Sequence, residues 1–494
     1  MKKISLRFLI ALLPLFVPVF TLAQGQWDIL NDVAKKTLGI ASSFRFNDQL
    51  GVYQVNLNDS TFELIALNNK MEILWRNQFK GNGVACGKFK DNLLAIADSG
   101  YSRRTEFVNP YYAYLIDPLS GKTILQKEIF KQQAKHQEIA YPFFTGDGSD
   151  FSLIVRQTNR KLGMLLSFKD KTEDVTIIKL DEKLEATYLK PKFPNETFVS
   201  MTGNWQGDLF VLTVKDDITS TARSNGHGEG EPLDKGYISL VARRYERGAI
   251  EPSEPISQKC ESLADFDLFR GYNAITPSEK DRNILFLAIA HNNNDDDREL
   301  FIGKFDFASH TSQSSSEVFT GKYVRAIEKS FIPVNDYYQK ANIGSQKKQL
   351  TVKYFREHNG KLVTVMAESF FATMYNVTTY YEKAYIINCY DNDLKKQFQQ
   401  LMPVYRGSSE ELTSGFKFEE NALKIVSNTD DYPVYGQLDL ITGKWVKLEP
   451  LKAADNYYSD KHIIWFDNSF IVPSLRHPGI FGNKYNIDLL RFSY

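Results

Sequence analysis

The chain has 494 residues with 60 basic and 60 acidic side chains, so its formal net charge is zero. This balance gives no electrostatic basis for binding nucleic acid, and we expect no nucleic-acid partner. Its three cysteines stand far apart without a Cys-x-x-Cys pair, which favours neither a zinc site nor a disulfide framework. Cys86 and Cys389 fall in apolar, strand-like runs, where we expect them to be buried as small hydrophobic residues.

The first 23 residues have the form of a signal peptide. Lys2, Lys3 and Arg7 are followed by an apolar run, Phe8–Phe20, and by small residues. The run is short for a membrane span and contains two prolines. We therefore expect cleavage near Ala23–Gln24 and an exported protein, whether periplasmic, cell-surface or secreted, with no transmembrane segment in the mature chain.

Residues 24–43 are predicted to form a short N-terminal helical segment. Asp28 can cap a helix that ends before Gly39. The residues that would share its apolar face are Ile29, Leu30, Val33, Ala34 and Leu38. From residue 44 to residue 494 the helical period disappears and strands dominate.

A strand–turn–strand unit recurs along this second region. The stretch Tyr114–Leu125, with its Asp-x-x-Ser-Gly-Lys turn, is nearly repeated at Gly436–Val446. A unit repeated along one chain indicates a repeat architecture. Three segments, 83–127, 350–398 and 415–447, each contain four predicted strands, which is the size of one propeller blade.

The turn between the third and fourth predicted strands serves to count the blades. Candidate turns stand at Asn68, Asp117, Asp181, Tyr245, Asp306, Asp391 and Asp439. We therefore expect residues 44–494 to form a single all-β propeller of about seven four-stranded blades, with six or eight as alternatives. Because an open ring leaves sheet edges unpaired, we expect a strand from 463–492 to pair beside the early strands of Phe44–Asn56.

The Asp-x-x-Ser/Thr-Gly-Lys turns resemble the blade repeats of quinoprotein-like (PQQ-type) β-propellers. The fuller pattern of that group is Ala-x-Asp-x-x-x-Gly-Lys-x-x-Trp. Here Leu115 and Gln437 stand at the alanine position, and Leu125 and Lys447 stand at the tryptophan position. A further segment, 64–75, keeps the alanine and the tryptophan but lacks the glycine. The resemblance implies a fold like that of the many exported bacterial propellers of unassigned function; it does not imply a quinone cofactor.

Motifs that carry chemistry are sparse. No nucleophile elbow, phosphate loop or zinc-protease motif appears. Gly146–Asp150 loosely resembles a calcium loop but lacks its spacing, so we predict a hairpin turn between Phe144 and Phe151. The acidic stretch Asn292–Asp297 is interpreted as a solvated hairpin tip. We expect no metal and no cofactor.

The two faces of a propeller differ in their connections. In a four-stranded meander, second-to-third loops and blade-to-blade connections open on one face, here called the loop face. First-to-second and third-to-fourth turns open on the other, here called the turn face. The long connections belong to the loop face and are predicted at Ser99–Pro110, Asp216–Gly236, Asn292–Asp297, Glu368–Lys383 and Asn428–Pro433.

Binding residues concentrate on loops held by a rigid scaffold. The candidate ligand-binding residues on the loop face are Arg103, Arg104, Glu106, His227, Tyr375, Tyr380, Tyr381, Asp430, Asp431 and Tyr432. Two alternatives stay open: the tyrosines could cover the bases of their own loops, and His227 could lie in a flexible loop without a chemical role.

The sequence favours a monomeric binding or scaffolding propeller outside the cytoplasm, which engages an envelope protein or glycan through its loop face. The alternative is a propeller enzyme, such as a hydrolase or lyase, with a pocket at the central channel. An enzyme would need convergent titratable groups there, and the sequence identifies no catalytic residue.

Overall fold

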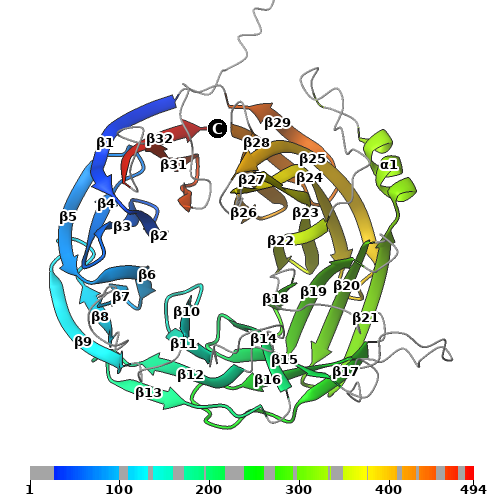
Figure 1. Ribbon diagram of the computed structural model, residues 1–494, viewed down its shortest axis with the longest axis horizontal. Coiled ribbons are helices and arrows are strands. Elements are labelled where there is room, and N and C mark those ends of the chain that lie inside the picture. Colours follow the sequence, from blue (N-terminus) through cyan, green and yellow to red (C-terminus); the bar gives the residue numbers. More distant parts are fainter. Residues whose placement is uncertain are drawn as a thin grey trace, which may run out of the picture.

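The chain folds into a ring of four-stranded sheets (Figure 1). The computed structural model describes residues 27–99, 110–131, 137–158, 172–193, 196–216, 238–260, 273–292, 298–331, 334, 349–374, 377–408, 414–429, 433–451, 462–476 and 484–494. Within these ranges there are eight such sheets. The fold is an all-β propeller, and the predicted number of about seven blades is wrong.

Seven blades are contiguous antiparallel meanders. Blade 1 contains β2 (Gly39–Asn47), β3 (Leu50–Asn58), β4 (Thr61–Leu67) and β5 (Ile73–Lys80). Blade 2 contains β6 (Asn82–Phe89), β7 (Asn92–Asp98), β8 (Pro110–Ile116) and β9 (Thr123–Lys131). Blade 3 contains β10 (Gln137–Phe144), β11 (Phe151–Thr158), β12 (Thr172–Leu180) and β13 (Ala186–Leu189). Blade 4 contains β14 (Glu196–Gly203), β15 (Leu209–Asp216), β16 (Ile238–Tyr245) and β17 (Ile256–Cys260).

The next three blades follow the same order from the inner to the outer strand. Blade 5 contains β18 (Asn273–Pro277), β19 (Ile284–Asn292), β20 (Arg298–Asp306) and β21 (Thr311–Phe319). Blade 6 contains β22 (Gln349–His358), β23 (Lys361–Met374), β24 (Val377–Asp391) and β25 (Lys396–Ser408). Blade 7 contains β26 (Gly415–Glu419), β27 (Ala422–Asn428), β28 (Pro433–Asp439) and β29 (Trp445–Pro450).

Blade 8 joins the two ends of the chain. Its strands, from the inside outward, are β30 (Ile464–Trp465), β31 (Ser469–Arg476), β32 (Tyr485–Ser493) and β1 (Trp27–Thr37). The ends therefore share a blade, as predicted, but the predicted partner was wrong, because β1 pairs with β32. The early strands β2 and β3 belong to blade 1 and meet blade 8 through side chains, with Tyr53 and Val55 in one apolar cluster with Ile471.

Because blade 8 is divided between the two ends of the chain, counting third-to-fourth turns gave seven blades where there are eight. All seven predicted turns between third and fourth strands are present, from Asn68 after β4 to Asp439 at the end of β28. In blade 8 the third strand ends at Ser493 and the fourth begins at Trp27, so no turn joins them. A blade without that turn has no mark in the sequence by which to count it.

The predicted N-terminal helix is strand β1, and the apolar spacing that suggested a helix comes from bulges. Leu30, Ala34 and Thr37 pair with Leu489, Ile487 and Tyr485. The first step along β1 therefore advances four residues and the second advances three, while each step along β32 advances two. Asp32 and Lys36, with φ of 53° and 54°, lie within these irregular steps. Extra residues in a strand turn the period of two into the three-to-four spacing typical of a helix.

The helix that the described ranges do contain is α1 (Gly321–Ser330), between blades 5 and 6. The Thr320 side chain accepts a hydrogen bond from the Tyr323 backbone N–H and so caps its first turn. Val324 and Ile327 are buried against the cluster that blades 5 and 6 share.

The hydrophobic core lies between neighbouring blades. Among the described residues there are eight apolar clusters, and each is formed mainly by the facing sheets of two adjacent blades. The three cysteines are buried and unpaired, which confirms the expectation for Cys86 and Cys389. Burial raises the pKa of the Cys86 thiol to about 12, so it stays protonated at neutral pH.

A first prediction concerns closure of the ring at Asp488. Its buried carboxylate accepts hydrogen bonds from the Asp32 backbone N–H (2.6 Å) and from Arg476 Nε (3.0 Å), which ties β1 to β32 and β31. Asp488→Ala should lower the free energy of unfolding by about 2 kcal/mol, because it removes one of the two carboxylate partners of Arg476 and leaves the Asp32 backbone N–H without its acceptor.

The matched control is Asp28→Ala on the same strand pair. Asp28 pairs with Arg491 through a carboxylate that is 44% exposed, so its loss should cost less than about 1 kcal/mol. Urea unfolding of both variants measures the difference, and equal losses would show that Asp488 has no special part in closure.

Candidate functional site

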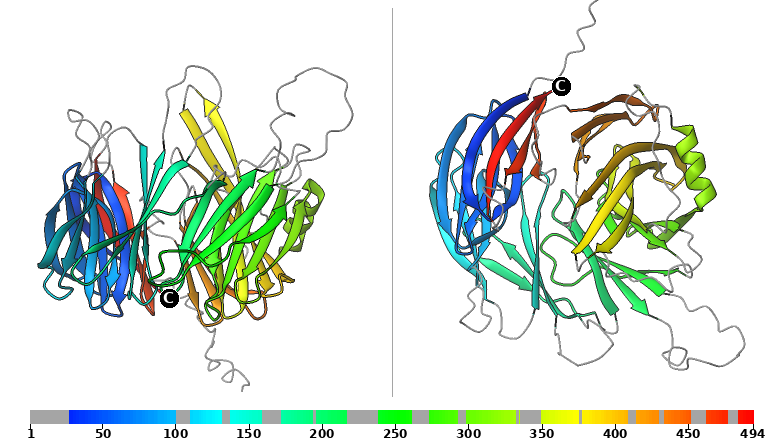
Figure 2. Two further views of the ribbon diagram at one scale, coloured as in Figure 1. Left: turned by 90° about the horizontal axis from the view of Figure 1, so that it is seen from below. Right: turned by 45° about the horizontal axis from the view of Figure 1, so that its top comes forward.

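The two faces of the ring are built differently. On the turn face every connection is short, from two residues at 359–360 to ten at 246–255. On the loop face the connections reach the length of 217–237, and β23 and β24 rise beyond the other strands (Figure 2, left). The predicted asymmetry of the faces is therefore confirmed for the connections.

On the turn face, the repeated Asp-x-x-x-Gly turn is a docking site for side chains of the preceding blade. Asp117 accepts hydrogen bonds from the backbone of Leu119 and Ser120, which fixes the turn, and Gly121 has a φ of 69°. A Cβ at Gly121 would lie 2.4 Å from the Trp75 ring. Trp75 Nε1 donates to the Pro118 carbonyl (2.8 Å). The glycine is thus required both by its φ and by the docked indole.

The second copy of the turn works in the same way. Gly443 has a φ of 66°, and a Cβ there would lie 2.6 Å from the ring of Phe398 in blade 6. Gln400 donates to the Gly443 carbonyl (2.6 Å), as Asn77 donates to the Gly121 carbonyl (2.9 Å). In both places an aromatic residue and an amide two residues later hold the next blade. These turns are structural, as their sequence indicated.

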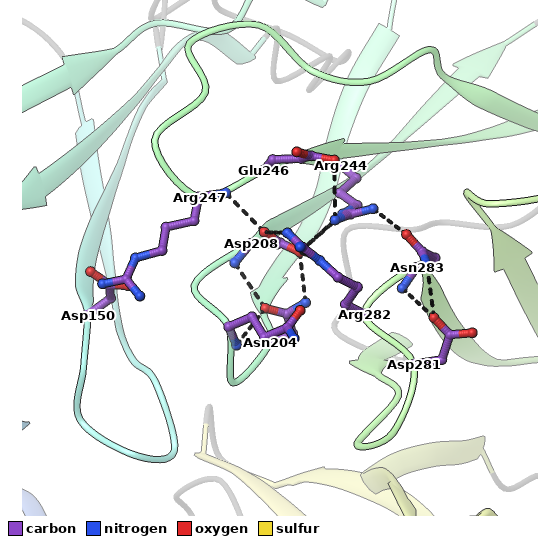
Figure 3. Close-up of polar contacts among 10 residues, drawn as sticks. Asp150, Asn204, Asp208, Arg244, Glu246, Arg247, Asp281, Arg282 and Asn283 are labelled. Atoms are coloured by element: carbon purple, nitrogen blue, oxygen red, sulfur yellow. Dashed lines mark hydrogen bonds and ion pairs between the residues drawn. The ribbon is translucent and has the colours of Figure 1, made fainter.

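A buried carboxylate, Asp208, holds three blades together on the turn face (Figure 3). Its Oδ2 accepts from Arg244 Nη2 (2.9 Å) in its own blade and from Arg282 Nε (3.1 Å) in blade 5. Its Oδ1 accepts from Arg282 Nη2 and from the backbone N–H of Arg247, both at 2.9 Å. Arg247 Nε in turn lies 2.8 Å from Asp150 Oδ2 in blade 3.

We call Asp208, Asp150 and the three arginines that contact them the Asp208 clasp, in which two carboxylates meet three guanidinium groups. Burial alone would raise the pKa of Asp208, but the hydrogen bonds from Arg282, the Arg247 backbone and Asn204 outweigh it and lower the pKa below 3.8. The carboxylate is therefore ionised at neutral pH and fully engaged. Such a group suits cohesion of the ring better than proton transfer.

On the loop face, β23 and β24 extend beyond blade 6 as a paired arm. Residues 370–374 pair with 377–381, down to Met374 opposite Val377. The predicted long loop Glu368–Lys383 is thus mostly strand, and the connection itself is 375–376. The β-branched and aromatic residues of this stretch favour strands, which explains the difference. We call residues 370–381, with 407–408 of β25, the arm.

A bulge marks the base of the arm. Ser369 pairs with Glu382 while Glu368 pairs with Ala384, so Lys383 has no counterpart in β23. The pairing of β24 with β25 is irregular at the same level. A bulge bends a strand and increases its twist, and it thereby directs the arm away from the plane of the blade.

Buried charges fix this base. Glu382 Oε2 accepts from Arg406 Nε (3.0 Å) and Nη2 (2.7 Å), and Lys353 Nζ lies 2.7 Å from Glu382 Oε1. Arg406 Nη2 also donates to the Tyr385 hydroxyl (2.7 Å), which lies 2.5 Å from Ser414 Oγ at the start of blade 7. We call these five residues the base cluster.

The other side of the base is tied to blade 5. Glu368 is buried, and its Oε1 lies 3.1 Å from Arg298 Nη1 at the start of β20. The arm therefore stands on a base held by both neighbouring blades. This arrangement can present a surface to a partner without moving the rest of the ring.

Of the predicted site residues, the structure describes two, both in β24 of the arm. Tyr380 pairs with Phe371 and Ser408, and Tyr381 pairs with Phe370 and Gly407. The Tyr381 ring lies over Gly407, where a Cβ would be 2.8 Å from it, so it covers the neighbouring strand. The predicted residues outside the described ranges are Arg103, Arg104, Glu106, His227, Tyr375, Asp430, Asp431 and Tyr432.

Sequence reasoning missed the base cluster. Glu382 and Arg406 are 24 positions apart and belong to no motif. One signal was available: each is a charged residue within an apolar or aromatic strand-like run, where an unpaired charge would be costly.

Thr145–Asp150 forms the predicted hairpin turn between Phe144 and Phe151, with Gly148 at a φ of 75°. The acidic residues 293–297 lie outside the described ranges. Among described residues, no three His, Cys, Asp or Glu side chains are grouped so that they could hold a metal ion. In the same part of the chain, no helix has the length and apolar character needed to cross a membrane.

Comparison with known proteins gives structural likenesses at low sequence identity. No protein-family description and no curated protein matches the chain. Among solved structures, BamB from Moraxella catarrhalis has 8% identity and a TM-score of 0.39, over 95% of this chain and 97% of BamB. An oligogalacturonate lyase in complex with manganese has 10% identity and a TM-score of 0.41, over 95% and 96%. The Dos1 propeller has 8% identity and a TM-score of 0.44, over 94% of both chains. Likenesses this distant carry no argument about function.

A second prediction tests the Asp208 clasp. Asp208→Ala should lower the free energy of unfolding by about 3–5 kcal/mol, because it leaves Arg244 buried without its carboxylate. Glu246→Ala is the matched control, since Glu246 is an exposed partner of the same arginine and its loss should cost less than about 1 kcal/mol. Equal midpoints of urea unfolding for the two variants would contradict the assignment.

A third prediction concerns pH. Because the folded-state pKa of Asp208 is lowered below 3.8, its contribution to stability is present above that pH and is lost as the pH falls through the folded-state pKa. The gap in unfolding free energy between the native protein and Asp208→Asn should be constant near neutral pH and narrow below pH 3.8. Urea titrations across acid pH measure it, and a gap independent of pH would argue against an ionised Asp208.

Proposed function

We propose that the protein is an extracytoplasmic binding or scaffolding propeller that engages an envelope protein, or an envelope glycan, through its loop face. The observation that carries the proposal is the arm on its charged base. A partner surface gains affinity when it is ordered before binding, because little conformational entropy is then lost. The turn face, by contrast, uses its conspicuous groups to hold blades together.

The strand edge of the arm favours a protein partner over a glycan. Among the described pairings, β22 accompanies β23 only from Gln349 opposite Ser369 downward. Residues 370–374 are therefore paired on the β24 side alone in those pairings. A strand edge of this kind can accept an extended peptide segment, whose backbone supplies affinity while alternate side chains supply specificity.

We propose that candidate residues outside the described ranges contribute to the same face. Arg103, Arg104 and Glu106 stand in the second-to-third connection of blade 2, and His227 stands in that of blade 4. In blade 7 the corresponding connection contains Asp430, Asp431 and Tyr432. A partner bound to the arm would lie on the same side of the ring as these second-to-third connections.

We extend the proposal to origin and location. The Asp-x-x-x-Gly-Lys turns support descent of the blades from quinoprotein-like repeats. The basic and apolar start of the chain supports removal of residues 1–23 during export, and the ring is proposed to act as a monomer.

A fourth prediction tests the arm. Replacing residues 371–380 with Asn-Gly keeps the Phe370–Tyr381 pair and closes it with a two-residue hairpin turn. Loss of the arm should reduce recovery of a protein partner from envelope fractions at least about tenfold, as expected when a central contact is removed. Quantitative mass spectrometry of affinity pull-downs measures the change.

The control is Trp205→Ser, which removes an exposed aromatic side chain from the turn face and should leave recovery unchanged. Equal recovery of every protein by the shortened and native chains would refute the proposal. If the shortened chain lost the native chain's glycan binding on an array while protein recovery was unchanged, the face would be assigned to sugars instead. Turnover of an envelope polymer by the native protein would favour the enzyme alternative.

A further inference from the structure

A two-residue turn on the turn face, Asn359–Gly360, joins β22 to β23 and places a reactive amide beside a backbone nitrogen. Asn359 is exposed and has a φ of 52°, and Gly360 has a φ of 79°, as in the hairpin turns that favour Asn-Gly. An asparagine side chain can react with the backbone nitrogen that follows it, because the two close a five-membered ring. Glycine leaves that nitrogen unobstructed, since it has no side chain.

A buried carboxylate holds the nitrogen of this pair. The Gly360 N–H donates to Glu357 Oε1 at 2.5 Å, and Glu357 is fully buried. The other oxygen, Oε2, accepts from the Glu279 backbone N–H and from Ser278 Oγ (3.3 Å), which belong to a turn of blade 5. The carboxylate is therefore anchored from a neighbouring blade, with Oε1 at the nitrogen that would react. A group placed to accept a proton from a nucleophile is positioned as a general base.

The amide group of the pair is held as well. Asn359 Nδ2 donates to the Glu420 carbonyl in blade 7 (2.7 Å) and lies 3.2 Å from His358 Nε2. His358 Nδ1 lies 3.0 Å from Glu279 Oε2, and its ring stacks on that of Phe418 with centroids 4.8 Å apart. The reacting pair thus belongs to an ordered turn where blades 5, 6 and 7 meet. Order of this kind lowers the entropic part of a reaction barrier.

We infer that Asn359 is a site of self-catalysed deamidation, in which Glu357 removes the proton of the Gly360 nitrogen. That nitrogen bonds to Asn359 Cγ, the Cγ–Nδ2 bond breaks, and Nδ2 leaves as ammonia after it takes up the proton that Glu357 removed. The product is a succinimide within the turn. Water then opens either of its two carbonyl–nitrogen bonds and leaves aspartate or isoaspartate at position 359. The net reaction consumes one water and releases one ammonia.

The product changes the contact between blades 6 and 7. A carboxylate at position 359 has no hydrogen to donate to the Glu420 carbonyl, so the contact made by Asn359 Nδ2 is lost. It also adds a negative charge to a turn that already contacts the Glu357 carboxylate. Isoaspartate would in addition lengthen the backbone of a two-residue turn. The reaction therefore weakens one joint of the ring as the protein ages, and it is independent of the arm on the loop face.

The chain contains a site for comparison at Asn82–Gly83. The Gly83 N–H donates to Asn56 Oδ1 (2.7 Å), which is an amide oxygen and a far weaker base than a carboxylate. Asn82 and Gly83 also lie in the paired strand β6. The two sites share the reacting pair and differ in the base and in the backbone around it. A third Asn-Gly pair, 225–226, lies outside the described ranges.

Timed incubation of the folded chain at neutral pH tests the inference. Proteolytic digestion and mass spectrometry measure aspartate and isoaspartate at each site. Asn359 should convert at least about tenfold faster than Asn82. It should also convert at least about tenfold faster than the same asparagine in a synthetic peptide of residues 354–365, because the peptide does not hold Glu357 against Gly360. Equal or slower conversion in the folded chain than in the peptide would overturn the inference.

Glu357→Gln separates the effect of the base from that of the local sequence. It should slow conversion of Asn359 in the folded chain by about tenfold or more, and it should leave the rate in the urea-unfolded chain unchanged. The matched control is Glu420→Gln, which alters an exposed carboxylate of the neighbouring turn, keeps the backbone carbonyl and should convert at the native rate. Equal rates in folded Glu357→Gln and native chains would overturn the assignment of the base. If Glu357→Gln does not fold, the comparison of the native chain with the peptide still decides.

Asn359→Gly tests the consequence for the ring. Glycine accepts the positive φ of this position and has no amide to lose, so the variant cannot react. After incubation, the native chain should unfold at a lower urea concentration than before, to an extent that follows the converted fraction, while Asn359→Gly should not change. A converted native chain with an unchanged midpoint would show that the joint between blades 6 and 7 is not weakened.

Discussion

The whole ring depends on one antiparallel pair, β1 with β32. Each blade buries its apolar faces against two neighbours, so an open ring would expose two core surfaces and an unpaired strand edge. The pair joins residues near the two ends of the described chain, with Trp27 opposite Phe492. Asp488 strengthens it with a buried carboxylate that reaches a left-handed residue, Asp32, in the bulged strand. The bulges that give β1 its helix-like apolar spacing also belong to its pairing with β32 at the edge of blade 8.

Cohesion and recognition are divided between the two faces. On the turn face, docked side chains such as Trp75 and Phe398 and the carboxylate of Asp208 link neighbouring blades, so these groups are occupied. On the loop face, buried charges serve a different purpose, since Glu382 and Arg406 order the base of an arm that leaves the ring. A partner can therefore engage the arm without competing with the contacts that hold the blades. The same kind of interaction, a buried ion pair, holds blades together at Asp208 and orders the base of the arm at Glu382.

Local patterns in the sequence predicted much of this architecture. Alternating apolar runs and the Asp-x-x-x-Gly-Lys turns identified the blades and all seven third-to-fourth turns, because both depend on residues close in the chain. The eighth blade, strand β1 and the base cluster escaped, since each depends on contacts between distant segments. Glu382 meets Lys353 and Arg406 only after the four strands of blade 6 have paired, and no spacing rule encodes that meeting. The candidate residues Tyr380 and Tyr381 lie in strand β24, where the sequence predicted a loop.

The composition of blade 8 also sets the order of events during synthesis. Strand β1 is made before all the other described strands and its partner β32 after them, so the N-terminal edge must wait until blades 1 to 7 have been synthesised. Blades 1 to 7 can form in turn from local hairpins, whereas the final blade requires closure of a loop that includes them all. Until then both ends of the nascent ring present unpaired strands, which is the period of greatest exposure to aggregation. Truncation late in the chain would therefore harm folding far more than the few residues lost would suggest.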